Sequence, residues 1–193
     1  NKYKQYKLKS KFDDVSKNNE HSIQFYKKLK QKVIFENLKE KNLARALQLF
    51  NKTNQFNFSL NRYTDITLKK LLKNKIYSIE IVSFKDKFGD HGIIGAYIVK
   101  KDKFKVEIID FVLSCRVLNR YVEDFIILKI MKDNNNKKIS ILYKNNKVNN
   151  VLIPIFLKKE YFELKKKNKK LFKYDIKLID KSYEIEKIFN QRT

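Results

Sequence analysis

The segment Phe88-Gly-Asp-His-Gly-Ile-Ile-Gly95 contains all three glycines of this 193-residue chain. Glycine adopts positive φ and allows close backbone approach at no steric cost, so a chain that uses it only here has a demanding backbone in this segment. Asp-His-Gly before an apolar run fits a hairpin turn between two buried strands, which is the simpler interpretation. The alternative interpretation is that the segment shapes a functional site.

The sequence around the glycines predicts an antiparallel meander of three strands. Residues 76–84, 93–100 and 104–113 are rich in β-branched and aromatic side chains, and short polar turns separate them. Because the chain has 42% hydrophobic residues, it is able to bury one core, and we expect one domain.

Other elements are predicted on both sides of the meander. The pattern indicates helices over residues 22–29 and 43–50, a short strand over 33–35, and a helix capped by Thr64 that runs to residue 72. After the meander we expect a buried helix over 122–131, a strand over 139–143, a helix over 148–157 despite Pro154, and a lysine-rich loop over 165–170.

The chain is strongly basic, with 45 Lys and Arg against 21 Asp and Glu and a formal net charge of +24. Such a charge is typical of proteins that bind nucleic acid, an anionic membrane or an acidic protein. Lys, Asn, Ile, Phe and Tyr are all abundant, while Gly, Ala and Pro are scarce, as in any protein encoded by A/T-rich DNA. We therefore favour a solvated lysine surface over a dedicated nucleic-acid face.

The scarcity of cysteine and histidine limits the chemistry. Cys115 is the single cysteine, which excludes an internal disulfide, and with only His21 and His91 a Cys/His zinc site lacks ligands, so we expect no metal. A reducing cytoplasm fits this usage best. The N-terminal Asn-Lys-Tyr-Lys-Gln-Tyr-Lys has no apolar run behind it, so we expect no signal peptide, membrane anchor or membrane partner.

The predicted order of elements is that of the GNAT acyltransferase fold, an α/β (α+β) fold with a mixed, mostly antiparallel central sheet flanked by helices. Over residues 22–164, four motifs resemble, in the same order, the C-terminal GNAT-like domain of the FkbH-like proteins. These motifs are Arg45-Ala-Leu-Gln-Leu-Phe-Asn-Lys-Thr-Asn-Gln-Phe-Asn57, Arg62-Tyr63, Asp86-Lys-Phe-Gly-Asp-His-Gly-Ile-Ile-Gly95 and Leu113-Ser-Cys-Arg-Val-Leu-Asn-Arg-Tyr-Val-Glu123.

In that family the GNAT-like domain follows a HAD-type domain, which takes a glyceryl group from a phosphorylated three-carbon donor to an acyl carrier protein. The present chain has no Asp-x-Asp motif, so the phosphate chemistry of the HAD half is absent. We expect residues 1–21 to be a linker from a missing upstream HAD-type domain and residues 22–193 to be the GNAT-like domain.

The resemblance implies acyl or glyceryl transfer that involves a carrier-protein phosphopantetheine thioester. The runner-up is a catalytically silent module that docks the acyl carrier protein, and nucleic-acid binding is a distant third. Transfer predicts an open cleft between splayed strands near Cys115. Silent docking predicts that side chains fill this cleft, whereas nucleic-acid binding predicts a basic stripe with exposed aromatic residues.

The segment Arg116-Val-Leu-Asn119-Arg120-Tyr121 stands where GNAT enzymes have an Arg/Gln-x-x-Gly-x-Gly/Ala loop. That loop holds a pyrophosphate because free N–H groups and the helix dipole favour an anion there. Asn119 replaces the first glycine and visits the left-handed region readily. Tyr121 replaces the second glycine and obstructs phosphate, so we expect coenzyme A to bind weakly or not at all.

Arg116 and Arg120 are suited to grip one phosphate, such as that of a carrier protein's phosphopantetheine arm. The equal alternative is that both arginines pair with Glu123 and Asp124 at the surface. Arg45 lies on an apolar helix beside Gln48, and a buried pairing with Asp86 or Asp90 is its expected role.

Candidate catalytic residues lie near the same loop. A GNAT fold would place the thioester beside Cys115, for which His91 is the one plausible base, although a lone cysteine at a strand end is more often a small core residue. Asp90 and Tyr143 are further acid–base candidates. The amides of Asn54 and Gln55 either hold a pantetheine or acyl amide or tie their loop to the sheet.

Overall fold

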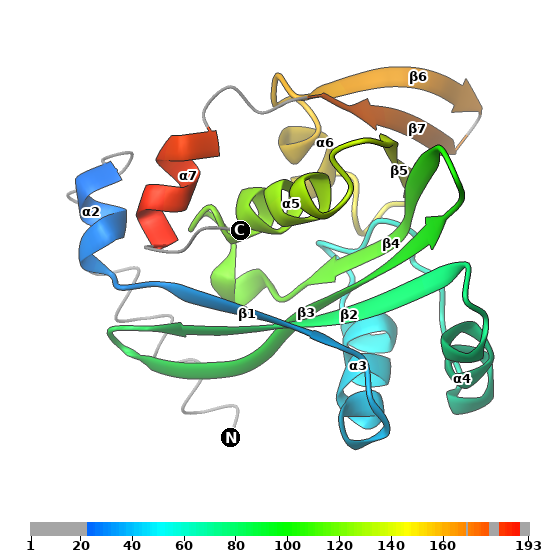
Figure 1. Cartoon of the computed structure of the whole chain (residues 1–193), viewed down its shortest axis with the longest axis horizontal. Coiled ribbons are helices and arrows are strands. Elements are labelled where there is room, and N and C mark those ends of the chain that lie inside the picture. Colours follow the sequence, from blue (N-terminus) through cyan, green and yellow to red (C-terminus); the bar gives the residue numbers. More distant parts are fainter. Residues whose placement is uncertain (1–22, 169, 178–181, 190–193) are drawn as a thin grey trace.

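The computed structural model describes residues 23–168, 170–177 and 182–189 (Figure 1). The strands are β1 (Lys32–Asn37), β2 (Tyr77–Asp86), β3 (Gly89–Lys101), β4 (Lys105–Leu113), β5 (Lys138–Lys144), β6 (Phe162–Asn168) and β7 (Leu171–Ile176). The helices are α2 (Ile23–Lys28), α3 (Glu40–Lys52), α4 (Asp65–Lys73), η1 (Cys115–Val117), α5 (Val122–Asp133), α6 (Leu152–Phe156) and α7 (Ser182–Phe189). The linker predicted for residues 1–21 lies outside the described residues.

One seven-stranded sheet runs in the order β1-β2-β3-β4-β5-β7-β6. Only the pair β4 and β5 is parallel, because α5 crosses between them, and the other pairs are antiparallel. In Figure 1, α3 and α4 lie on one side of the sheet, and α5 lies on the other side with α2 and α7 nearby. The expected mixed, mostly antiparallel sheet flanked by helices is confirmed.

Local sequence signals account for several element boundaries. The Thr64 side chain accepts a hydrogen bond from the N–H of Thr67, and the Thr67 hydroxyl accepts one from the N–H of Thr64, which makes a reciprocal cap at the start of α4. α5 is buried along most of its length, as its apolar sequence predicts. The three-strand meander is present as β2, β3 and β4.

Two predicted elements differ. The lysine-rich stretch predicted as a loop lies largely within β6, an edge strand that needs only β7 as a partner and whose exposed lysines discourage pairing with another chain. The helix predicted over 148–157 shortens to α6, because Asn149 is buried and bonds the backbone of Lys144 and Asn57. Pro154 is tolerated in the first turn of α6, where an N–H has no intrahelical partner.

The glycine segment belongs to a hairpin, as the simpler interpretation predicts, but the turn lies at Lys87 and Phe88, and Asp90-His91-Gly92 lies inside β3, where the pairing register with β2 shifts. Asp86 pairs with Gly89 across the β2–β3 turn. Gly92 has φ +67°. A Cβ on Gly95 would stand 2.8 Å from Cδ1 of Leu113 and 3.0 Å from the carbonyl oxygen of Val112, so β3 and β4 approach too closely for a side chain here.

Replacing Gly92 with valine is expected to destabilise the fold by about 1–3 kcal/mol through backbone strain at positive φ. Nothing lies within 4 Å of the added Cβ, so no clash contributes. The matched control is Gly92→Asn, which tolerates the left-handed region and should lose less. Urea unfolding measures both variants, and equal stability of Gly92→Val and wild type would contradict the assignment.

Candidate functional site

The two parallel strands at the centre of the sheet separate toward the end that leads into α5. β4 and β5 pair only from Lys105–Lys138 to Ile108–Ile141. Beyond Ile108, β4 continues to Leu113 without pairing to β5. This is the place at which the sequence predicts a cleft.

A segment of the chain itself occupies this separation. The Leu113 N–H donates to the Phe56 carbonyl (3.0 Å), and the Phe58 N–H donates to the Phe111 carbonyl (3.0 Å). On the other side, the Lys144 N–H donates to the Phe58 carbonyl (2.8 Å). Residues 56–58, which we call the wedge, therefore act as a short strand that joins the diverging ends of β4 and β5.

Aromatic side chains pack the wedge into the core. Phe56 and Phe58 are buried, and both rings contact Phe111 of β4 and Phe156 of α6 with centroids 5.4–6.2 Å apart. Phe58 also contacts the ring of Tyr143. The gap between the splayed strands is thus closed by side chains as well as by backbone hydrogen bonds.

Two buried amides hold the wedge. The Asn57 side chain donates to the carbonyls of Phe50 (3.2 Å) and Thr53 (3.0 Å), and the Asn149 side chain donates to the Asn57 carbonyl (2.8 Å). The two amides that the sequence singled out, Asn54 and Gln55, are exposed just before the wedge. The Asn54 side chain accepts a hydrogen bond from Arg62 (2.9 Å), so it ties its loop as one alternative predicted, and Asn57 and Asn149 add further ties.

The loop between β4 and α5 keeps the backbone shape of a glycine loop without glycines. Asn119 and Tyr121 both have φ +62°, in the left-handed region. The conformation expected for Asn119 is therefore confirmed. Tyr121 bears the same strain at the N-cap of α5, where its ring packs edge-on against Tyr26 with centroids 5.0 Å apart.

A carboxylate already lies at the N-terminus of α5. The buried Glu123 carboxyl group lies near the backbone N–H groups of Asn119 and of Glu123 itself, which lower its pKa slightly. Burial, and then the charge of Asp124, raise its pKa to about 7. A carboxyl group of the chain itself therefore lies near the N–H groups that would bind a phosphate in this frame.

The neighbouring Asp124 has partners of its own. It is buried, and it accepts hydrogen bonds from Lys159 (2.6 Å) and Tyr161 (2.7 Å). The alternative in which Arg116 and Arg120 pair with Glu123 and Asp124 at the surface is therefore wrong for both carboxylates.

Arg120 lies in the core instead. Its side chain is 0% exposed, and its Nη1 atom lies 2.6 Å from Oδ2 of Asp86, which is itself 0% exposed. His91 completes the cluster with Nε2 3.1 Å from the same oxygen. This placement corrects the expectation that Arg120 reaches a bound phosphate, since the guanidinium faces Asp86 inside the fold.

The Asp86 carboxylate accepts several hydrogen bonds from the protein. Its Oδ1 atom accepts from the N–H groups of Phe88 (2.8 Å) and Gly89 (3.1 Å) at the β2–β3 turn. Burial by itself would raise the pKa of Asp86, but His91 and Arg120 outweigh it, and the pKa is lowered. The stabilisation is present at neutral pH and is lost as acid protonates the carboxylate.

The predicted pairing of Arg45 with Asp86 or Asp90 is wrong. Its guanidinium donates to the carbonyl of Ile93 (2.8 and 3.2 Å) and to the side chain of Gln48 (2.5 Å). The half-buried Arg45 side chain thus joins α3 to β3.

The three predicted catalytic residues have different surroundings. Cys115 is exposed, which corrects the interpretation of it as a core residue. His91 is buried against Asp86, while Asp90 points to the other side of β3 and pairs with Lys85 (2.9 Å). Beside the thiol, the half-buried Arg116 donates to the Ser114 hydroxyl (2.9 Å). A catalytic role for Cys115 with His91 and Asp90 stays a prediction.

Sequence reasoning missed a buried polar cluster at the base of the wedge. Asp110 is 0% exposed and accepts hydrogen bonds from Ser59 (2.5 Å) and Tyr63 (2.9 Å). Burial raises its pKa to about 6 in spite of these bonds. Leu60, between the two donors, has φ +56°. The aspartate inside the apolar run Ile108-Ile-Asp-Phe-Val-Leu113 was the available signal.

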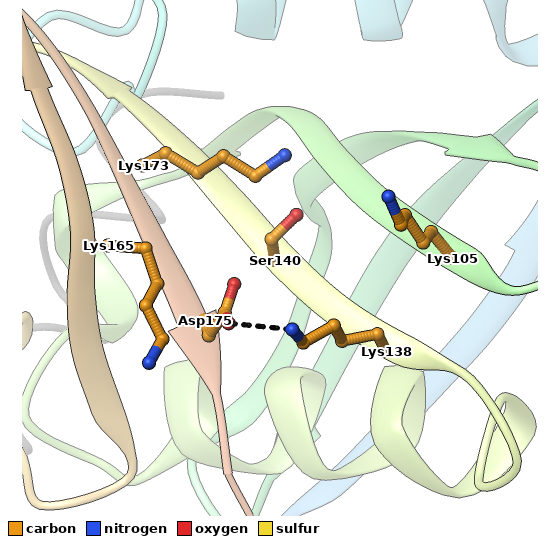
Figure 2. A pocket seen from close by; sticks show the side chains of 6 residues that line it. All are labelled: Lys105, Lys138, Ser140, Lys165, Lys173 and Asp175. Carbon is orange, nitrogen blue, oxygen red and sulfur yellow. Dashed lines mark ion pairs between the residues drawn. The ribbon is translucent and has the colours of Figure 1, made fainter.

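A hollow of about 260 Å³ lies on the sheet, and Figure 2 shows the side chains that line it. It is lined by Lys105, Lys138, Ser140, Lys165, Lys173 and Asp175. Lys138 lies 3.8 Å from Asp175, and Lys173 and Lys165 form ion pairs with Glu107 and Glu163. Neighbouring carboxylates thus balance much of the lysine charge, as expected for a solvated surface.

The described ranges contain no group of three or more His, Cys, Asp and Glu side chains placed to hold a metal ion. Nor do they contain a helix that is long and apolar enough to cross a membrane.

Comparison with known proteins defines the fold. No protein-family model and no curated protein matches the chain. Among solved structures, an acetyltransferase from Thermus thermophilus is similar, with a TM-score of 0.56, 9% identity, and coverage of 75% of this chain and 96% of that one. The PaiA N-acetyltransferase of Thermoplasma acidophilum, solved with coenzyme A, gives a TM-score of 0.51 at 15% identity, covering 76% and 99%.

A spermidine N-acetyltransferase from Vibrio cholerae, solved with CoA and spermine, gives a TM-score of 0.53 at 11% identity and covers 75% of this chain and 94% of that one. At these identities the likeness concerns the fold. The chain has the α/β fold of GNAT-family acetyltransferases, as the order of its elements predicts.

Two aspartates of one hairpin provide a matched test of the buried cluster. Asp86→Asn removes the charge opposite the buried Arg120 and should cost about 3–5 kcal/mol of unfolding free energy. Asp90→Asn removes only an exposed pair with Lys85 and should cost under about 1 kcal/mol. Denaturant unfolding at neutral pH measures both, and similar small losses would show that the Arg120–Asp86 pair is not structural.

Glu123→Gln is expected to stabilise the fold above about pH 7 and not below about pH 4.5. The folded pKa of about 7 exceeds the ordinary value of 4.5, so wild-type stability falls as pH rises through this window. Glutamine keeps the acceptor oxygen without the charge, whereas the control Glu123→Ala removes the acceptor and should destabilise at both pH values. Thermal unfolding at both extremes measures the effect, and a pH-independent difference for Glu123→Gln would contradict it.

Proposed function

We propose that this domain is a docking module for an acyl carrier protein, built on the acetyltransferase fold, and that it does not transfer acyl groups itself. The observation that carries the proposal is the wedge. Residues 56–58 hydrogen-bond both β4 and β5 in the separation where transfer would require an open cleft.

The loop before α5 supports the same proposal. The Glu123 carboxyl group lies near the N–H groups that would hold a phosphate, and in its ionised form, which predominates above about pH 7, it would repel a pyrophosphate. Tyr121, at the second glycine position of the loop, adds a bulky ring that packs against Tyr26. Coenzyme A is therefore a poor ligand for this chain.

We infer the acyl carrier protein as a partner from the four motifs that resemble those of the FkbH-like proteins. In such a protein, a separate HAD-type domain performs the glyceryl transfer, and a neighbouring module that holds the carrier raises its local concentration. The net charge of +24 favours an acidic partner. Arg116, with the exposed Asn54 and Gln55, is the group we assign to the phosphopantetheine arm.

The competing function is acyl or glyceryl transfer by the domain itself. The exposed Cys115 thiol beside the loop favours it, because an accessible thiol is able to exchange with a thioester. A partner base would be needed, and His91 is buried against Asp86. Silent docking therefore ranks above transfer.

The first expected outcome is that coenzyme A binds with a Kd weaker than about 1 mM, less than about 4 kcal/mol of binding free energy, whereas an acyl carrier protein binds more tightly. Calorimetric titration measures both ligands. Incubation with an acyl-carrier thioester should leave Cys115 unmodified by mass spectrometry. Micromolar coenzyme A binding, or an acyl adduct on Cys115 that Cys115→Ser abolishes, would move transfer ahead of docking.

Arg116→Ala should weaken binding of the phosphopantetheinylated carrier by more than about 1.5 kcal/mol, the lower range for a charge-assisted hydrogen bond. Binding of the unmodified carrier should change little. Lys105→Ala, at the lysine hollow, is the control that removes one positive charge elsewhere. Equal losses for both carrier forms would refute the arm-binding role of Arg116, and tight binding of plain DNA by wild type would favour nucleic-acid binding instead.

A further inference from the structure

Apolar side chains are exposed on α6 and in the turn before it. Val148 is 49% exposed, Val151 is 63% exposed and Ile155 is 62% exposed. Val148 and Val151 lie in the turn before α6 and Ile155 lies in α6, whereas Ile153 and Phe156 of α6 are buried in the core. An exposed apolar stripe of this kind on a soluble surface marks a contact site.

Lysines predominate in the segment that carries this stripe, and the exposed Glu160 follows it. Residues 134–159 contain six lysines and no Asp or Glu. Lys144, Lys147 and Lys158 are exposed beside the stripe. The Asn145 N–H also donates to the Lys170 carbonyl (2.7 Å), which brings the lysine-rich β6–β7 turn to the start of the same surface. The lysine hollow is different, because carboxylates compensate its lysines.

One lysine links the end of α6 to the loop before α5. Lys159, which follows α6 closely, lies over the ring of Phe156 (4.9 Å) and over the ring of Tyr121 (6.0 Å). Lys159 therefore brings the end of α6 next to Tyr121 at the start of α5.

We propose that Val148, Val151 and Ile155, with the lysines around them, form a docking surface for an acidic amphipathic helix. Apolar side chains of that helix would cover the stripe while its carboxylates face Lys144, Lys147 and Lys158. The identification of this helix with one of an acyl carrier protein rests on the proposed function. The aliphatic stripe favours protein over single-stranded nucleic acid, which needs aromatic rings for base stacking.

The test compares two variants with substitutions at exposed apolar residues, so that loss of folding is not the cause of lost binding. Val151→Asp with Ile155→Asp places two negative charges on the docking surface. Phe104→Asp, at the β3–β4 turn, changes a residue that is 67% exposed elsewhere. Amide chemical shifts in NMR spectra report binding of two probes: an acyl carrier protein, and a synthetic amphipathic helix with Glu on one face and Leu on the other.

The expected result is that both probes shift the amides of α6 and that the double variant weakens each by at least about tenfold, while Phe104→Asp does not. Carrier binding that is equal in wild type and the double variant would overturn the surface but leave the proposed function standing. Binding of the synthetic helix at α6 without carrier binding would defeat the proposed function and support the surface.

Three further results would overturn the docking surface. One is that neither probe shifts the amides of α6. Another is concentration-dependent dimerisation, seen by analytical ultracentrifugation and lost in the double variant, which would assign the stripe to a second copy of this chain. The third is displacement of the synthetic helix by single-stranded DNA, which would assign it to nucleic acid.

Discussion

The buried ion pair between Arg120 and Asp86 is the interaction on which the geometry around the candidate site depends. It joins the loop before α5 to the β2–β3 turn, which are 34 residues apart in the chain. Because both side chains are buried away from water, each charge would be costly without the opposite charge beside it. The Asp86 carboxylate also contacts His91 and accepts hydrogen bonds from two backbone N–H groups. The pair holds Arg120 between two left-handed residues, Asn119 and Tyr121, whose strain it helps to maintain.

The same need for buried partners explains why the strand separation is closed. Where β4 and β5 diverge, each leaves backbone groups without a ladder partner, and a buried group of that kind is costly. The wedge hydrogen-bonds backbone groups at both edges, and the Glu123 carboxyl group lies near N–H groups at the start of α5. An outside ligand would have to displace groups that are already hydrogen-bonded within the chain.

Local signals were readable in the sequence, whereas long-range pairings were not. The three glycines predict the hairpin, Thr64 with Thr67 predicts a helix start, and Asn119 predicts a left-handed residue, because each effect acts within a few residues. The partner of Arg120 and the partners of Phe56–Phe58 depend on contacts between distant segments, which no periodicity encodes. The lysine-rich part of β6 lacks the alternation of apolar and polar residues from which a strand is predicted, so its sequence indicates a loop. An edge strand with little buried surface forms without that alternation.

Because residues 56–58 fill the separation between β4 and β5, a partner has to bind elsewhere on the domain. The interior positions around the separation of β4 and β5 are committed to hydrogen bonds and aromatic contacts, so recognition passes to the outer surface. There, most of a large lysine excess is ordinary solvated charge, which attracts any anion weakly and selects none. Selection requires that charge coincide with an apolar surface that is otherwise left in water, and the docking surface that we propose at α6 would combine the two.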